Sequence, residues 1–137
     1  MAEDDGHFRV TIVTPSGTQE EYNVRHIRAP GTEGDFGVLP NHLPFLTTLR
    51  IGAIYLDIDQ GRLVWATSGG FAEVLPDRVT ILAETAEKAE SIDLERAEAA
   101  RERALRRLSQ REPGVDIDRA RIALARALNR IEVASRT

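Results

Sequence analysis

Apolar and polar residues alternate along much of the first two thirds of the chain. The first such run is the clearest, because Phe8, Val10 and Ile12 alternate there with polar side chains. Successive side chains of a β-strand point to opposite faces, so this alternation indicates a strand with one buried face. The same period recurs around Tyr22 and in several later segments. We therefore expect β-strands over residues 7–86.

Turn-forming residues separate these runs at short intervals. The expected turns or breaks lie at Pro15-Ser16-Gly17, Pro30-Gly31, Gln60-Gly61 and Pro76-Asp77. Residues 34–49 hold two glycines and two prolines among apolar residues. Both residue types weaken strand pairing, so we expect an irregular, partly buried path there instead of a strand. Many short strands with regular turns predict an antiparallel β-sandwich or a flattened barrel.

The pattern changes to a helical one in the last third of the chain. Residues 92–136 are rich in Ala, Leu, Arg and Glu, and Glu112-Pro113-Gly114 interrupts them once. Because Pro and Gly end a helix, we expect two helices joined as an antiparallel hairpin. Asp116 is placed to cap the second helix, and Asp118 lies in its first turn, where the helix dipole favours an anion.

Each helix carries one narrow apolar stripe at helical spacing. The predicted members are Leu94, Ala97, Ala104, Leu105 and Leu108 on the first helix, and Ile117, Ala120, Leu124, Ala127, Leu128, Ile131 and Ala134 on the second. Many of them are Ala, and each buried methylene contributes only about 0.8 kcal/mol. The stripe is compatible with a marginal hairpin that opens or docks elsewhere, and also with an ordinary stable hairpin.

These patterns together predict an α+β chain in which the β part precedes the α part. The boundary falls near Ala86–Ser91, where β-branched residues give way to Ala and Glu. We expect a β-sandwich domain at residues 1–88 and a helical hairpin at residues 89–137. No cysteine is present, so disulfides and thiol catalysis are excluded. The acidic N-terminus lacks the apolar core of a signal peptide, and no segment has the roughly 18 consecutive apolar residues of a membrane span.

Charge is distributed unevenly along the chain. Residues 1–91 carry a balance of −7, residues 92–137 a balance of +3, and the whole chain −4. The basic residues of the tail alternate with acids, which is typical of a solvated helix surface. All seven aromatic residues lie at or before Phe71, so the tail offers no platform for stacking bases. We therefore do not expect nucleic-acid binding.

Candidate catalytic chemistry is sparse. The three histidines, His7, His26 and His42, have no partner at metal-ligand spacing, and we expect no metal site. Ser68 precedes two glycines but lacks the G-x-S-x-G pattern of a nucleophile elbow, and Lys88 follows no phosphate-binding loop. We expect no catalytic residue. For His42 we expect a structural role, with a hydrogen bond to nearby backbone.

The arginines of the hairpin are spaced in a way that suits binding of a phosphate group. Asp93, Arg96 and Arg103 fall on one side of the first helix, and Arg126 and Arg130 are i,i+4 neighbours on the second. If the hairpin folds back, the two arginine pairs could converge beside Asp93 and Glu87. Arginine binds phosphate in a bidentate manner, so this arrangement could hold a nucleotide without catalysis. The alternative interpretation is ordinary surface ion pairs.

Three parts of the chain form a specific pattern together: GDFGVLPNHLPFLTTLRIG, SGGFAEVLPDRVTILAE, and the hairpin with IDLERA and ALARALNRI. With these segments the sequence resembles the epsilon subunit of the bacterial rotary ATP synthase. The resemblance extends from about Phe8 to Ala134. Asn41 is a departure, because the family often has Gly at this position.

The resemblance implies a non-catalytic subunit of the proton-translocating ATP synthase, peripheral on the cytoplasmic face of the bacterial plasma membrane. Its sandwich would clamp onto the gamma subunit and sit on the ring of c subunits, coupling ring rotation to ATP synthesis. The region around Glu33, Asp35 and His42 resembles the part that faces the ring. The rival interpretation is a stand-alone sandwich and helical adaptor of another assembly.

The resemblance also implies that the hairpin is regulatory. Folded down it would permit turnover, and extended along gamma it would reach the alpha/beta catalytic head and brake ATP hydrolysis. IDLERA is similar to the I/L-D-x-x-R-A motif that some members use to bind ATP. The residues implied for nucleotide binding are Glu87, Ile92, Asp93, Arg96, Ala97, Arg103, Arg126 and Arg130. ATP would be a regulatory ligand, with no cofactor required. Alternatively, the motif only packs the hairpin on the sandwich.

Overall fold

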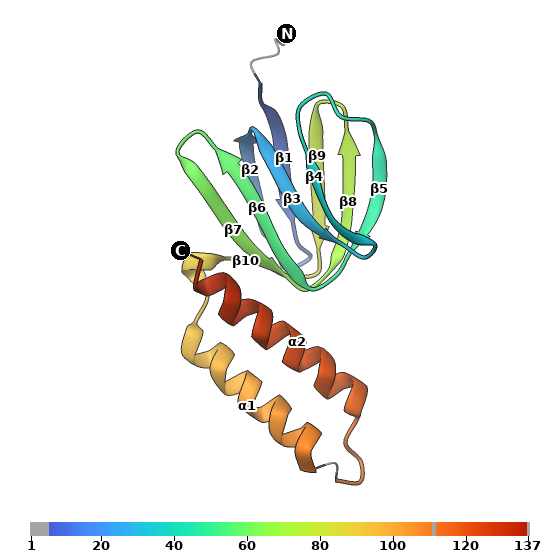
Figure 1. Ribbon diagram of the computed structural model, residues 1–137, viewed down its shortest axis with the longest axis vertical. Helices are drawn as coiled ribbons and strands as arrows, with labels where there is room; N and C mark the ends of the chain where they lie inside the picture. Colours follow the sequence, from blue (N-terminus) through green and yellow to red (C-terminus); the bar gives the residue numbers. More distant parts are fainter. Residues whose placement is uncertain (1–5, 111, 137) are drawn as a thin grey trace. The chain divides into compact units, whose positions relative to one another are not determined.

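The computed structural model describes residues 6–110 and 112–136 and divides the chain into two compact units, Met1–Lys88 and Ala89–Thr137 (Figure 1). The first five residues, part of the acidic N-terminus discussed above, lie outside the described residues. Among the described residues, the first unit contains ten strands and the second contains one short 3-10 helix and two α-helices.

The strands of the first unit form one sheet path. Their bounds are β1 Phe8–Val13, β2 Gln19–Val24, β3 His26–Gly31, β4 Gly34–Val38, β5 Phe45–Leu49, β6 Gly52–Ile58, β7 Gly61–Thr67, β8 Gly70–Leu75, β9 Arg78–Ala83 and β10 Ala86–Lys88. Their order is β10-β7-β6-β3-β5-β8-β9-β1-β2, and β4 pairs with the other edge of β3.

The sheet bends into two layers at the junction of β3 and β5. A single pair, Gly31 with Leu49, joins these two strands. On one side of the bend lie β10, β7, β6, β3 and β4, and on the other lie β5, β8, β9, β1 and β2 (Figure 1). β2 contacts β6 although the two are far apart along the path, so the layers face each other. The predicted sandwich followed by two helices is confirmed, with one exception to antiparallel pairing: β1 runs parallel to β9.

The core fills the space between the two layers. Val10 and Ile12 of β1, Ile54 and Leu56 of β6, and Ile81 of β9 have no exposed surface. They occupy alternate positions of their strands, as the period of two predicts. Each such side chain contributes about 1.5–3 kcal/mol when it leaves water. Burial of one face is therefore the main force that holds the sheet folded on itself.

The expectation of an irregular path at residues 34–49 is wrong. This segment forms strands β4 and β5, and both prolines fall in the loop between them. The glycines assist pairing, because a Cβ on Gly37 would lie 2.7 Å from Nε2 of His26. Pro30 and Gly31 are the last two residues of β3, so the strand ends at the expected break, with both residues still paired to β4. Pro30 cannot donate a backbone hydrogen bond, but its carbonyl accepts one from Arg50 at 2.9 Å.

The predicted turn at Gln60-Gly61 is shifted by one residue, since Gly61 already pairs with Ile58 and the turn is Asp59-Gln60. The turn at Pro76-Asp77 lies where it was expected, between paired Leu75 and Arg78.

The second unit is a helical hairpin. It comprises η1 Ala89–Ser91, α1 Leu94–Gln110 and α2 Ile117–Ala134. The two α-helices lie side by side and antiparallel (Figure 1). The predicted cap is confirmed: the Asp116 carboxylate accepts from the backbone N–H of Arg119 at 3.1 Å. Pro113 and Gly114 lie in the connecting turn, where Gly114 adopts a φ of 88°.

Of the predicted apolar stripe, only alanines are fully buried in the seam of the hairpin, and Val133 of α2, which was not predicted in the stripe, is also buried. Ala97, Ala104, Ala120 and Ala127 are at most 2% exposed. The larger stripe residues lie at the flanks of the seam, and Leu105 and Leu128 remain 43% and 47% exposed. The stripe was thus predicted too wide, because helices that approach over alanine have no room for leucine between them. The seam buries little apolar area.

Gly70 is the residue of the sandwich least able to accept a side chain. Its φ is 137°, and a Cβ would lie 2.1 Å from the carbonyl oxygen of Leu82. Gly61 has a φ of 136°, but a Cβ there meets no atom within 4 Å. Gly61→Ala is therefore a control for backbone strain, which costs about 1–3 kcal/mol.

We expect Gly70→Ala to lower the free energy of unfolding by about 1–3 kcal/mol more than Gly61→Ala does, because backbone atoms must shift to remove the clash. Urea unfolding followed by the fluorescence of Trp65 measures both values. Equal losses in the two variants would contradict the close packing of β8 against β9.

Candidate functional site

One outer face of the sandwich is apolar. It is formed by outward positions of β5, β8 and β9, where Phe71 lies opposite both Thr48 and Leu82. Phe71 and Leu82 are about half exposed, and Leu46 on the same face is 70% exposed. Single exposed apolar residues are ordinary, but neighbouring ones on adjacent strands indicate a contact surface for another macromolecule.

A shallow groove of about 360 Å³ continues this face toward β1. It is lined by Val13, Thr14, Pro15, Gly70, Phe71, Leu82, Ala83 and Glu84. Elsewhere on the sandwich, the loop between β4 and β5 exposes Leu39 and Leu43. We call Leu46, Phe71, Leu82 and this groove the apolar face. This face was not predicted from the sequence. Its signal is that Phe71 and Leu82 are apolar at positions of β8 and β9 where the alternation predicts polar, outward-facing residues.

The outer face formed by β3, β6 and β7 is polar, and its charges pair with one another. Asp57 accepts from Nε of Arg62 at 2.7 Å and lies 3.4 Å from Nδ1 of His26. The hydrogen bond from Arg62 holds the pKa of Asp57 below its ordinary value. The guanidinium groups of Arg28 and Arg62 both lie over the ring of Tyr55, at 5.9 and 5.6 Å from its centroid. These groups are already engaged within the chain.

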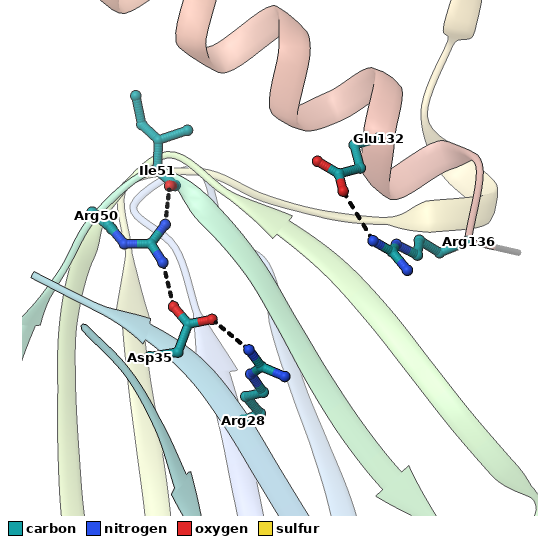
Figure 2. Close-up of polar contacts among 6 residues, drawn as sticks. All are labelled: Arg28, Asp35, Arg50, Ile51, Glu132 and Arg136. Carbon is teal, nitrogen blue, oxygen red and sulfur yellow. Dashed lines mark hydrogen bonds and ion pairs between the residues drawn. The ribbon is translucent and has the colours of Figure 1, made fainter.

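The β3–β4 hairpin carries two of the predicted contact residues, Glu33 and Asp35. Asp35 lies between two arginines: it accepts from Arg28 at 3.1 Å and from Nη2 of Arg50 (Figure 2). Arg50 also donates to the carbonyl of Ile51 at 3.1 Å. Asp35 therefore links β4 to β3 and to the residues that follow β5. Glu33 is exposed at the tip, so the two acids have different environments.

His42, the third predicted contact residue, lies in the loop between β4 and β5. Its ring meets the ring of Phe8 edge-on, with centroids 5.3 Å apart. Both ring nitrogens are buried, and in the described part of the chain neither has a hydrogen-bond partner. The expected hydrogen bond to backbone does not reach standard geometry, although the backbone of His42 and Leu43 lies near enough to the ring to act on its pKa. Burial lowers the pKa of His42, which favours the neutral form.

The preceding residue, Asn41, has a φ of 63°. This is the left-handed conformation, which glycine adopts freely and asparagine tolerates better than most residues. The loop therefore has a glycine-like backbone at Asn41, where the epsilon family often has Gly.

The residues implied for nucleotide binding are divided between the two units. Glu87 lies in β10 of the first unit, opposite Ala66 of β7. The other seven lie in the second unit, before or within α1 and in the second half of α2. Each group is described within its own unit.

Much of the I-D-x-x-R-A motif has a structural role in the hairpin. The Asp93 carboxylate accepts from the backbone N–H of Arg96 at 3.1 Å, so Asp93 caps α1. Ala97 is fully buried in the seam, and Ile92 is only 9% exposed. Asp93, Ala97 and Ile92 therefore have roles in folding the hairpin that do not depend on a ligand.

The arginines of the hairpin are the groups of this set that can reach a ligand. Arg96, Arg103 and Arg126 are exposed, and Arg130 is half-buried. Because the helices are antiparallel, the first half of α1 lies beside the second half of α2, which carries Arg126 and Arg130 (Figure 1). The structure thus places Arg96 and Arg130 in the same half of the hairpin, and Arg103 and Arg126 near the middle of their helices.

A cleft of about 410 Å³ lies at the opposite end of the hairpin. Its lining is Arg107, Gly114, Val115, Asp116, Arg119 and Ala120, and it includes none of the predicted nucleotide residues. Within residues 6–110 and 112–136, no three side chains form a candidate metal site. Neither α1 nor α2, as described, is long and apolar enough to cross a membrane.

Two family models match the chain over most of its length. The beta-sandwich domain of the ATP synthase Delta/Epsilon chain matches residues 7–89, and the long alpha-helix domain of the same chain matches residues 90–135. The chain belongs to the ATP synthase delta/epsilon chain family.

Individual relatives agree with this assignment. The chain is 52% identical over 109 residues to the ATP synthase epsilon chain of Desulfosudis oleivorans, covering 79% of this chain and 80% of the relative. It is 50% identical over 101 residues to the ATP synthase epsilon chain of Bacillus subtilis, covering 74% and 76%. These relatives are non-catalytic subunits of an enzyme complex, which confirms the predicted class.

Solved structures show the same fold. A chain in the cryo-EM structure of Euglena gracilis mitochondrial ATP synthase, described as OSCP/F1/c-ring, matches with a TM-score of 0.80 and 24% identity, covering 96% of this chain and 82% of that chain. A chain in the Tetrahymena thermophila mitochondrial ATP synthase, described as central stalk/c-ring, matches with a TM-score of 0.54 and 15% identity, covering 94% of each.

The different environments of Glu33 and Asp35 lead to a prediction about stability. We expect Asp35→Asn to lower the free energy of unfolding by about 0.5–2 kcal/mol, because two arginines lose a charged acceptor and each partly exposed ion pair contributes up to about 1 kcal/mol. The matched variant Glu33→Gln should change it by less than about 0.5 kcal/mol, as is usual for a surface position. Urea unfolding measures both, and equal effects would contradict a clamping role for Asp35.

Proposed function

We propose that this chain is the epsilon subunit of a proton-translocating ATP synthase and works in its central stalk. The observation that carries the proposal is the apolar face, on a sandwich that belongs to the epsilon family. The polar outer face pairs its own charges, whereas the apolar face exposes Leu46, Phe71 and Leu82 to water. A partner that covers these side chains gains free energy from their burial.

The partner at the apolar face is the gamma subunit. Two observations support this choice. The curated relatives are ATP synthase epsilon chains, and a chain of the same fold belongs to a structure described as central stalk/c-ring. The apolar face also has the aromatic and leucine composition that protein interfaces favour at their centres. Gamma binding would transmit rotation between the ring and the catalytic head.

The β3–β4 tip and the adjoining loop would contact the ring of c subunits. Glu33 supplies an exposed carboxylate there, and His42 fixes the loop by packing on Phe8. Asp35 holds the tip in place through Arg28 and Arg50 (Figure 2). Such a clamped tip loses little conformational entropy when it docks. The subunit would then be peripheral to the membrane at the cytoplasmic face, held there through the complex.

The hairpin would regulate ATP hydrolysis through the alpha/beta head. The alanine seam between α1 and α2 buries little apolar area, so the contact between the two helices contributes only a few kcal/mol. We call the hairpin with this contact intact the closed form. A ligand that binds only the closed form stabilises it by RT ln(1 + [L]/Kd), or about 2.7 kcal/mol at a hundredfold excess over Kd. ATP held by the arginines beside Asp93 would act in this way, and its loss would release the hairpin to brake hydrolysis.

The docking proposal predicts a difference between two aromatic residues. We expect Phe71→Thr to weaken binding of the full chain to the gamma subunit at least about tenfold, since aromatic anchors dominate interfaces. Tyr55→Thr, on the polar outer face, should leave the affinity unchanged. Titration calorimetry with purified gamma measures both. A parent chain without affinity for gamma would instead favour a stand-alone adaptor of another assembly.

The nucleotide proposal predicts a difference between two arginines of α2. We expect Arg126→Ala to raise the Kd for ATP about tenfold or more, because a charge-assisted hydrogen bond to phosphate is lost. Arg121→Ala is the control, since Arg121 lies beside Asp118 at 3.7 Å on another side of the helix. Amide NMR shifts during ATP titration measure both. Equal affinities would remove Arg126 from the site.

A further inference from the structure

The two strands at the ends of the sheet path, β10 and β2, meet through their side chains. Nζ of Lys88 in β10 lies 3.0 Å from Oε1 of Glu20 in β2. The same Oε1 accepts a hydrogen bond from the hydroxyl of Tyr22 at 2.5 Å. One carboxylate oxygen therefore joins a lysine of one layer to a tyrosine of the other.

Two aromatic contacts complete this cluster. Lys88 lies directly opposite Trp65 in the β10–β7 register, with its Nζ 5.8 Å from the indole centroid. Tyr22 meets the same indole edge-on at 6.2 Å. The indole N–H is buried and has no hydrogen-bond partner among the described residues, so packing and the lysine charge hold the ring. We call Glu20, Tyr22, Trp65 and Lys88 the seam cluster.

The seam cluster lies at the rim of the sandwich interior, where the side chains of Glu20 and Lys88 are each still 37% exposed. Glu20 and Tyr22 share their strand face with Val24, which is fully buried, and Trp65 is 2% exposed. Tyr22 and Lys88 hold the pKa of Glu20 below its ordinary value, so the carboxylate stays charged at neutral pH. An inward-facing ion pair at the end of a sheet excludes other strands and orders the strands it joins.

The position of Lys88 in the chain gives the cluster a second role. The first unit ends at Lys88 and the second begins at Ala89, the first residue of η1. β10 has three residues, too short to be held firmly by backbone pairing alone. We propose that the Glu20–Lys88 pair anchors the origin of the hairpin, so that movement of the hairpin begins after Lys88 and β10 stays with the sandwich.

The anchor itself does not depend on the regulatory role proposed for the hairpin. Its effect on ATP hydrolysis does, because that effect rests on the hairpin inhibiting hydrolysis. An anchored origin limits the positions that the hairpin can sample and so raises its effective concentration at the docking surface of the head. If β10 detached, several further residues of slack chain would lower that concentration. Lys88 is thus a positioning residue for the brake, although it touches neither nucleotide nor head.

Hydrogen exchange of the full chain tests the anchor itself. Lys88→Met keeps most of the aliphatic stem and removes the charge, and we expect β10 amides to exchange about five- to thirtyfold faster. Lys88→Arg should restore the parent rates. Arg9→Met is the matched control, because Arg9 pairs with Glu21 on the other face of β2 at 3.9 Å. Unchanged β10 exchange in Lys88→Met would overturn the proposal.

Hydrolysis by the reconstituted ATP synthase tests the consequence. We expect Lys88→Met to weaken the inhibition of hydrolysis at least about twofold, while Lys88→Arg and Arg9→Met behave as the parent does. Full inhibition despite faster β10 exchange would overturn the positioning role. A parent enzyme without any inhibition would instead overturn the proposed regulation, and the exchange rates would then decide the anchor by themselves.

Discussion

The first unit depends on a sheet that buries only one of its faces. The ten described strands of one sheet cannot all cover their apolar side unless the sheet folds back on itself, and the bend at Gly31 and Leu49 permits this. Once the two layers enclose the core, two outer faces and the junction between the end strands β10 and β2 remain. The charges of the polar face pair with one another, and Glu20 and Lys88 bridge the junction. The apolar face stays exposed to water.

The hairpin obeys a different constraint. Helices that meet over Ala97, Ala104, Ala120 and Ala127 approach closely but bury little apolar area. Asp93 and Asp116 cap the N-termini of α1 and α2. Local interactions therefore stabilise each helix, whereas the contact between the two helices is weak. Under the proposed regulation, the helices would stay intact while the hairpin changes partners, and the proposed anchor at Lys88 would fix where that movement begins.

Alternation and turn residues predicted the sandwich, the hairpin and the cap at Asp116 because these depend on local pattern. The same reasoning failed at residues 34–49, where cross-strand contacts of Gly37 with His26 support strands that glycine and proline disfavour locally. It also placed three exposed leucines, Leu94, Leu105 and Leu128, in the contact between the helices, since period alone does not give the distance between helices. The apolar face and the seam cluster escaped prediction because each joins residues distant in sequence, as Glu20 and Lys88 do.

The central claim is that the outer faces of the sandwich are divided, one satisfied by its own charges and one reserved for the stalk. Chemical cross-linking of the assembled complex tests it most directly, with single cysteines placed at exposed positions in this cysteine-free chain. The account predicts that a cysteine at Leu46 links to gamma and that one at Arg62 does not. Links to gamma from Arg62 alone would contradict it.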